Sequence, residues 1–73
     1  MPHITVKVGK VPGSVREVVL ESGATVDDAL QAAEMENTGY ETTHNGTKIY
    51  DDDFDNEVRN GDTIILSKKV RGA

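Results

Sequence analysis

The amino-acid sequence predicts a small α+β domain, in which one helix packs on one face of a four- to five-stranded mixed sheet. Apolar and polar residues alternate over residues 4–8, which is the period of a half-buried strand. An apolar stripe over residues 26–33 has instead the spacing of one helix face. The dipeptide Asn45-Gly46 is a strong hairpin signal, because both central residues of a type I′ turn take a positive φ. One helix on one sheet face satisfies the two-layer rule.

The N-terminal segment predicts a β-hairpin. Residues 9–14 contain the glycines and the proline of a loop, and they follow the first strand directly. A β-branched run over residues 15–20 then forms the second strand, with Val18 and Leu20 facing the core. The strand ends at residues 21–23, which hold a serine and a glycine.

A helix is predicted to begin after Thr25, whose hydroxyl can accept a hydrogen bond from an unpaired N–H of the first turn. Asp27 and Asp28 follow, where the helix dipole favours negative charge. We expect a helix of about ten residues, because Asn37-Thr38-Gly39 supplies the next stop signal.

The C-terminal half predicts three further strands, over residues 40–44, 47–50 and 63–66. Phe54 and Val58 are the expected apolar anchors of the irregular segment between the last two. The predicted core joins the helix residues Val26 and Leu30 to one face of the sheet. That face comprises Ile4, Val6, Val18, Leu20, Ile64 and Leu66.

The composition restricts the class of protein. A chain of 73 residues forms a single domain, and the absence of cysteine excludes a disulfide framework, a thiolate zinc site and an iron–sulfur cluster. No apolar run approaches the ~20 residues that span a bilayer, and Met1-Pro2-His3 lacks the features of a signal peptide. We therefore expect a soluble, cytoplasmic protein.

The charge is acidic and unevenly distributed. The net charge is −5, but Lys68, Lys69 and Arg71 leave five basic against thirteen acidic residues, or −8, in residues 1–67. An acidic body repels the phosphates of nucleic acids and anionic membranes. A protein partner with a basic surface fits this charge better.

Three segments together carry a family resemblance. They are Leu20-Glu21-Ser22-Gly23-Ala24-Thr25-Val26, Asn45-Gly46 and Val58-Arg59-Asn60-Gly61-Asp62-Thr63-Ile64. In this order they resemble the β-grasp fold of ubiquitin-like proteins, most of all the sulfur carriers: the small subunit of molybdopterin synthase and the thiamine sulfur carrier. The resemblance implies a β-grasp domain over residues 1–67 and a basic C-terminal tail over residues 68–73.

The tail departs from that branch at its last residue. Sulfur carriers end in Gly-Gly, whose terminal carboxylate an ATP-dependent E1-like enzyme adenylates, and the matching residues here are Gly72 and Ala73. The methyl group of Ala73 would crowd a narrow channel that glycine enters freely. Lys68, Lys69 and Arg71 either steer the tail to an acidic partner or only solubilise it.

The remaining polar clusters favour structural roles. The acidic run from Asp51 to Glu57 has some calcium-loop spacing, but Asn56 replaces the required glycine and Asp62 the final glutamate. A solvated loop is the preferred interpretation, so we predict no metal site. His3 and His44 have no nucleophile placed beside them by the sequence, so a surface role is preferred.

The outer face of the sheet is a candidate binding surface. If Val18 and Leu66 face the helix, Val19 and Ile65 face away from it, and we expect Thr5, Lys7, Thr42 and His44 to share that face. Exposed apolar groups on a sheet form docking patches, although β-branched residues also simply favour strands.

The sequence thus favours a non-enzymatic interaction module that is monomeric when free, needs no cofactor and has no catalytic residues. Its expected protein-binding residues are Val19, His44, Ile65, Lys68, Lys69 and Arg71. The alternative is a sulfur carrier or protein modifier activated at its C-terminal carboxylate.

Overall fold

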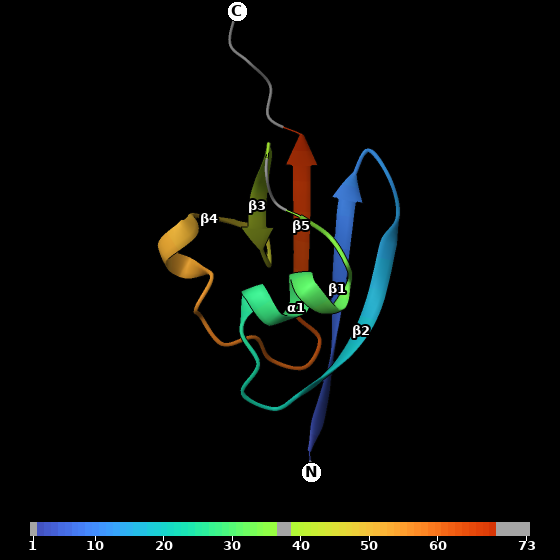
Figure 1. Ribbon diagram of the computed structural model, residues 1–73, viewed down its shortest axis with the longest axis vertical. Coiled ribbons are helices and arrows are strands. Elements are labelled where there is room, and N and C mark those ends of the chain that lie inside the picture. The colour runs from blue at the N-terminus through green and yellow to red at the C-terminus, as the bar shows by residue number, and fades with distance from the viewer. Residues whose placement is uncertain (1, 37–38, 69–73) are drawn as a thin grey trace, which may run out of the picture.

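The sheet and its single helix form two layers in the computed structural model, which describes residues 2–36 and 39–68 (Figure 1). The five strands have the order β2-β1-β5-β3-β4. Their bounds are His3–Val11 for β1, Val15–Glu21 for β2, Tyr40–His44 for β3, Thr47–Ile49 for β4 and Thr63–Lys68 for β5. Helix α1, Val26–Ala32, lies across one sheet face, and η1, a 3₁₀ turn, covers Asp51–Asp53. The β1–β5 pair is parallel and the other pairs are antiparallel, which confirms the α+β class and the mixed sheet.

Strand β1 is longer than the sequence predicts. The expected loop begins at Gly9, but β1 continues to Val11 and only residues 12–14 form the turn. The reason is a non-local pairing, because residues 7–11 of β1 pair with residues 63–67 of β5 on the side away from β2. A glycine and a lysine that favour a loop locally are thus held extended by strands on both sides.

The core lies between α1 and the helix-facing side of the sheet. Its buried apolar residues are Val6, Val8, Val18, Val26, Ala29, Leu30, Ala33, Val58, Ile64 and Leu66. Ile4, Leu20 and Phe54 are partly buried against this cluster, so the predicted core face is confirmed. Burying an aliphatic side chain of this size contributes roughly 1.5–3 kcal/mol, so this cluster is the main stabilising element of a small, disulfide-free domain.

The predicted start of the helix is confirmed by a capping box. The Thr25 hydroxyl accepts a hydrogen bond from the Asp28 N–H at 3.2 Å, and the Asp28 carboxylate accepts one from the Thr25 N–H at 3.0 Å. Two otherwise unpaired N–H groups are satisfied in this way. The helix is short, and no helix within residues 2–36 and 39–68 is long and apolar enough to cross a membrane.

The helix ends earlier than predicted, at Ala32 with Ala33 as its cap. Glu34 takes a positive φ of 57°, and its N–H donates to the carbonyl of Gln31. The Met35 N–H then donates to the carbonyl of Leu30, and both side chains pack in the core. These two bonds form a Schellman motif with glutamate where glycine is usual. The predicted stop signal lies later, and residues 37–38 are outside the described residues.

Replacing Glu34 by glycine should therefore stabilise the domain. A left-handed conformation costs a side-chain-bearing residue roughly 1–2 kcal/mol, and glycine avoids that cost at some loss of chain entropy. We expect Glu34→Gly to raise the free energy of unfolding by about 0.5–1 kcal/mol in urea denaturation. Ala32→Gly, inside the helix, is the matched control and should lower it; a loss of stability in both variants would contradict the assigned cap.

Candidate interaction surface

The sheet face opposite α1 carries an apolar patch that crosses three strands. Gly9 on β1 lies opposite Val15 on β2 and opposite Ile65 on β5. Residues that face each other across a ladder share a side of the sheet, so Val15 and Ile65 both stand on the outer face. Val11 lies two residues further along β1 on the same face. Val11, Val15 and Ile65 around Gly9 are called the outer-face patch below.

Gly9 leaves room for the side chains of the outer-face patch, because it has no side chain of its own. A Cβ atom at Gly9 would lie 2.8 Å from Cγ2 of Val15 and 3.1 Å from Cδ1 of Ile65. The two side chains therefore approach the backbone of Gly9 from both sides, and Gly9 is buried, while Val15 remains 57% exposed and Val11 50% exposed. The sequence prediction placed Gly9 in a loop and missed it. A glycine beside a β-branched run, which can mark a close approach inside a strand, was the available signal.

The two apolar residues predicted for the outer face are found there. Val19 lies opposite Thr5 on the outer face of β2 and is 65% exposed. Ile65 is half-buried under its neighbours in the patch. Val19 is separated from Val15 by Glu17, so it extends the patch along the edge of the sheet rather than joining it directly.

The prediction that Thr42 and His44 share this outer face is wrong. Thr42 lies opposite Leu66 and His44 opposite Ile64, so both side chains are on the helix side of the sheet. Thr42 is buried among the core residues at 3% exposure. Polar residues give no inward or outward signal of their own, and the register of β3 against β5 decides the face. Thr43 takes the outer position instead, opposite Ile65.

His44 belongs to a polar clamp between two turns. Its Nε2 lies 2.7 Å from Oδ2 of Asp62, and the Asn45 side-chain amide donates to Oδ1 of Asp62 at 3.0 Å. The same carboxylate accepts the N–H of Arg59 at 2.8 Å. Asn45 also accepts a bond from the Thr63 N–H at 2.8 Å. The clamp fastens the β3–β4 turn, whose Asn45 and Gly46 have the predicted positive φ, to the start of β5.

The clamp sets the ionisation of Asp62. Burial acts to raise the pKa of Asp62, but the hydrogen bonds from Asn45, His44 and the Arg59 N–H outweigh it, together with the charge of His44. The pKa of Asp62 therefore lies below its ordinary value. The ionised carboxylate is the form that these donors stabilise.

The remaining predicted site residues fall into two groups. Lys68, assigned by the sequence to the tail, is the last residue of β5 and pairs with Tyr40 on the helix side. Lys69, Arg71, Gly72 and Ala73 lie outside the described residues. Among the residues that the structure describes, no group of three or more histidines or carboxylates could hold a metal ion.

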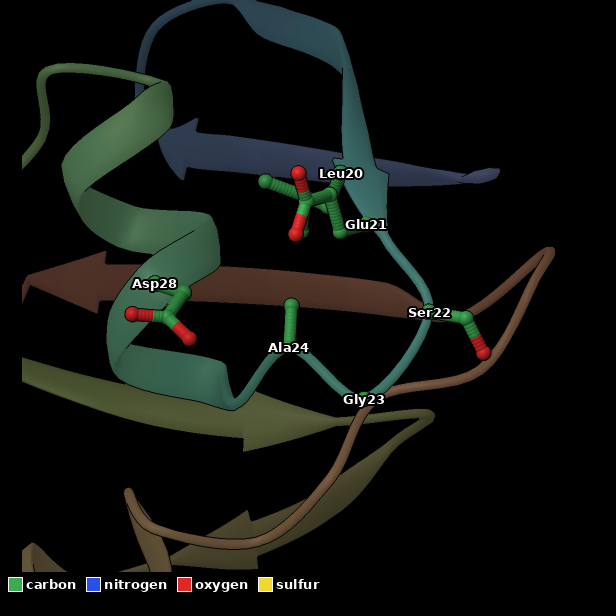
Figure 2. A pocket seen from close by; sticks show the side chains of 6 residues that line it. All are labelled: Leu20, Glu21, Ser22, Gly23, Ala24 and Asp28. Carbon is green, nitrogen blue, oxygen red and sulfur yellow. The ribbon is translucent and has the colours of Figure 1, made fainter. Parts of the chain in front are cut away.

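A shallow hollow of about 330 Å³ lies at the turn between β2 and α1 (Figure 2). Leu20 and Ala24 give it apolar walls, and Ser22, Glu21 and Asp28 line its polar side. Asp28 already accepts the Thr25 N–H in the capping box. Its carboxylate is therefore engaged in holding the helix start.

Acid should weaken the clamp. Because the folded pKa of Asp62 is depressed, its stabilisation is complete above the unfolded pKa of about 3.9 and is lost as the pH falls through the lower folded value. Asp62→Asn should lower the free energy of unfolding by about 1–2 kcal/mol at pH 7. It should also flatten the change in stability below about pH 4, measured by urea denaturation across pH. An unchanged acid profile in Asp62→Asn would show that other carboxylates dominate it.

No protein-family model matches the chain, and a search of curated proteins found no significant match. Solved structures do match. The Haloferax volcanii protein HVO 2177 has a TM-score of 0.71 at 16% identity, over 97% of this chain and 88% of that one. Ubiquitin of Caldiarchaeum subterraneum has 0.61 at 20% identity, over 99% and 100%. A ubiquitin-like protein of Trypanosoma brucei has 0.62 at 20% identity, over 93% and 96%.

At identities this low, the similarity carries the fold and leaves the branch within it undecided. Two of these three proteins are ubiquitin or ubiquitin-like by description. The match covers both layers, since nearly the whole of each chain is aligned. The chain therefore has the ubiquitin-like β-grasp fold.

Proposed function

We propose that this chain is a non-enzymatic interaction module that docks on a protein partner through the outer-face patch. The close approach of Val15 and Ile65 to Gly9, from the two neighbouring strands, carries the proposal. It places aliphatic side chains side by side on a sheet face that no other element of the described chain covers. Contiguous apolar groups in such a position are typical of protein-binding surfaces.

The charge of the domain indicates the kind of partner. Residues 1–67 hold thirteen acidic and five basic residues, a net charge of −8. A partner with a basic surface would be attracted over a long range, and its association would slow as salt screens the attraction. Nucleic acids and anionic membranes do not fit as partners for the same reason.

A catalytic role has little to support it in the described residues. His44 is engaged by Asp62, and within residues 2–36 and 39–68 no serine or threonine hydroxyl is hydrogen-bonded to it. A His–Asp pair without a nucleophile is a structural contact rather than a triad. The clamp is therefore best interpreted as a structural contact that holds the β3–β4 turn against the start of β5.

The docking proposal is tested by a charge placed within the patch. Ile65→Asp should leave the fold largely intact, because the side chain is on the outer face, but it should abolish capture of protein partners from an extract of the source organism. Ser22→Asp, exposed in the turn before α1, is the control for added charge and should retain capture. Leu66→Asp should unfold the domain, since Leu66 is fully buried. Retained capture by a folded Ile65→Asp variant would exclude the patch.

The alternative is a sulfur carrier or protein modifier that an E1-like enzyme activates at the C-terminal carboxylate. The match to an archaeal ubiquitin over 99% of this chain favours keeping this candidate. Intact mass after incubation with ATP and activating enzymes would show an adenylate, a thiocarboxylate or loss of Ala73. Activation of Ala73→Gly, with no reaction of the native chain, would favour docking alone.

A further inference from the structure

In the part of the chain that the structure describes, the sheet has one long edge strand, β2. Strands β2 and β4 are outermost, and β4 has three residues whereas β2 has seven. The β1–β2 register is regular from His3 opposite Glu21 to Gly9 opposite Val15, without a bulge. No proline interrupts β2. Proteins usually protect such edges with short strands, bulges, prolines or charged side chains. Of these devices, β2 has only the charged side chains of Arg16, Glu17 and Glu21.

The backbone of β2 presents hydrogen-bonding groups to this edge. The bonds from Lys10 N to Ser14 O and from Ser22 N to Pro2 O show that even-numbered residues face β1. In an antiparallel ladder the intervening residues point the other way. The N–H and C=O groups of Glu17 and Val19 therefore point outward. Outside the β1–β2 ladder, no other described group is hydrogen-bonded to them.

The side chains of the same residues define the chemistry of the edge. Val15, Glu17, Val19 and Glu21 stand in that order on the outer face, and all four are exposed. Apolar and acidic groups therefore alternate along the strand. A strand that pairs with this edge would place its own side chains directly opposite them, where opposite charges attract and like charges repel.

This charge pattern disfavours a second copy as the occupant. When two β2 strands pair in antiparallel fashion about Glu17, the two Glu17 carboxylates face each other. When they pair about Val19, Glu17 faces Glu21 of the other copy. Pairing about Val18 puts Glu17 diagonal to both glutamates of the other copy. Every antiparallel register that pairs most of β2 with itself thus brings carboxylates together, between two chains that each carry −5.

We propose that β2 accepts an extended segment of a partner protein as an additional antiparallel strand. The segment carries Lys or Arg opposite Glu17 and Glu21, and aliphatic residues opposite Val15 and Val19. Its backbone supplies the hydrogen bonds and its alternating side chains supply the selectivity. This inference rests on the proposed interaction function and specifies the chemistry of the partner. Val15 belongs both to the β2 edge and to the outer-face patch.

A synthetic peptide, acetyl-Lys-Thr-Val-Thr-Lys-Thr-Val-amide, tests the proposal with the intact chain. We expect saturable binding in fluorescence anisotropy, weakened about tenfold or more when both lysines are replaced by glutamate. Two further peptides carry N-methyl groups, one at its odd-numbered and the other at its even-numbered residues. One of the two should bind as weakly as the glutamate peptide, because its methyl groups replace the N–H groups that bond to the edge. Hydrogen exchange at Glu17 and Val19 should slow on binding.

Variants of the chain separate the edge from the patch. Val19→Pro should weaken peptide binding about tenfold, because it removes an outward N–H without breaking the β1–β2 ladder, and Val19→Ala is its matched control. Glu17→Lys with Glu21→Lys should reverse the preference toward the glutamate peptide. The Ile65→Asp variant should bind the peptide normally. The result of this test therefore does not depend on whether the outer-face patch binds a partner.

Three outcomes would overturn the edge proposal. The first is equal binding of the unmethylated peptide and of both alternately methylated peptides. The second is peptide binding with unchanged exchange at Glu17 and Val19. The third is self-association of the free chain that Val19→Pro abolishes, which would make a second copy the occupant. Peptide binding lost in Ile65→Asp but kept in Val19→Pro would overturn the edge while supporting the patch.

Discussion

The parallel pairing of β1 with β5 is the constraint on which the rest of this structure depends. It joins the N-terminal and C-terminal strands at the centre of the sheet, with Val8 opposite Ile64 and Gly9 opposite Ile65. The first pair points into the core beneath α1, and the second forms the middle of the outer-face patch. One register therefore fixes the stabilising face and the candidate binding face together. A slip of one residue would exchange them.

The two faces of the sheet have different roles: the helix side stabilises the fold, and the outer side is the candidate binding surface. The helix side combines an aliphatic core with the clamp around Asp62, which holds the β3–β4 turn against the start of β5. On the outer side, no element within residues 2–36 and 39–68 forms such a cover, and Val11, Val15 and Val19 are exposed. Because β1 and β5 occupy the centre, β2 is left at the edge with its outward backbone groups unpaired in the sheet. Patch and edge meet at Val15, so a single partner could use both.

Local signals in the sequence predicted the local features correctly. The helix start capped by the Thr25 hydroxyl and the turn at Asn45-Gly46 each depend on residues close together in the chain, and both are present. The missed features are non-local. Gly9 is extended because β5 pairs with it, and His44 faces the helix side because β3 aligns with β5. The helix ends at Ala32, before the predicted stop signal, and Met35 then packs against the core.

The central claim is that Val15 and Ile65 form one exposed apolar surface over Gly9. Methyl NMR of the free chain with a soluble paramagnetic probe tests it most directly. The account predicts a strong NOE between methyl groups of Val15 and Ile65, with both sets broadened by the probe. The methyl groups of Val6 and Ile64 should stay unaffected, because both residues are fully buried. An absent Val15–Ile65 NOE, or an Ile65 as protected as Ile64, would contradict the account.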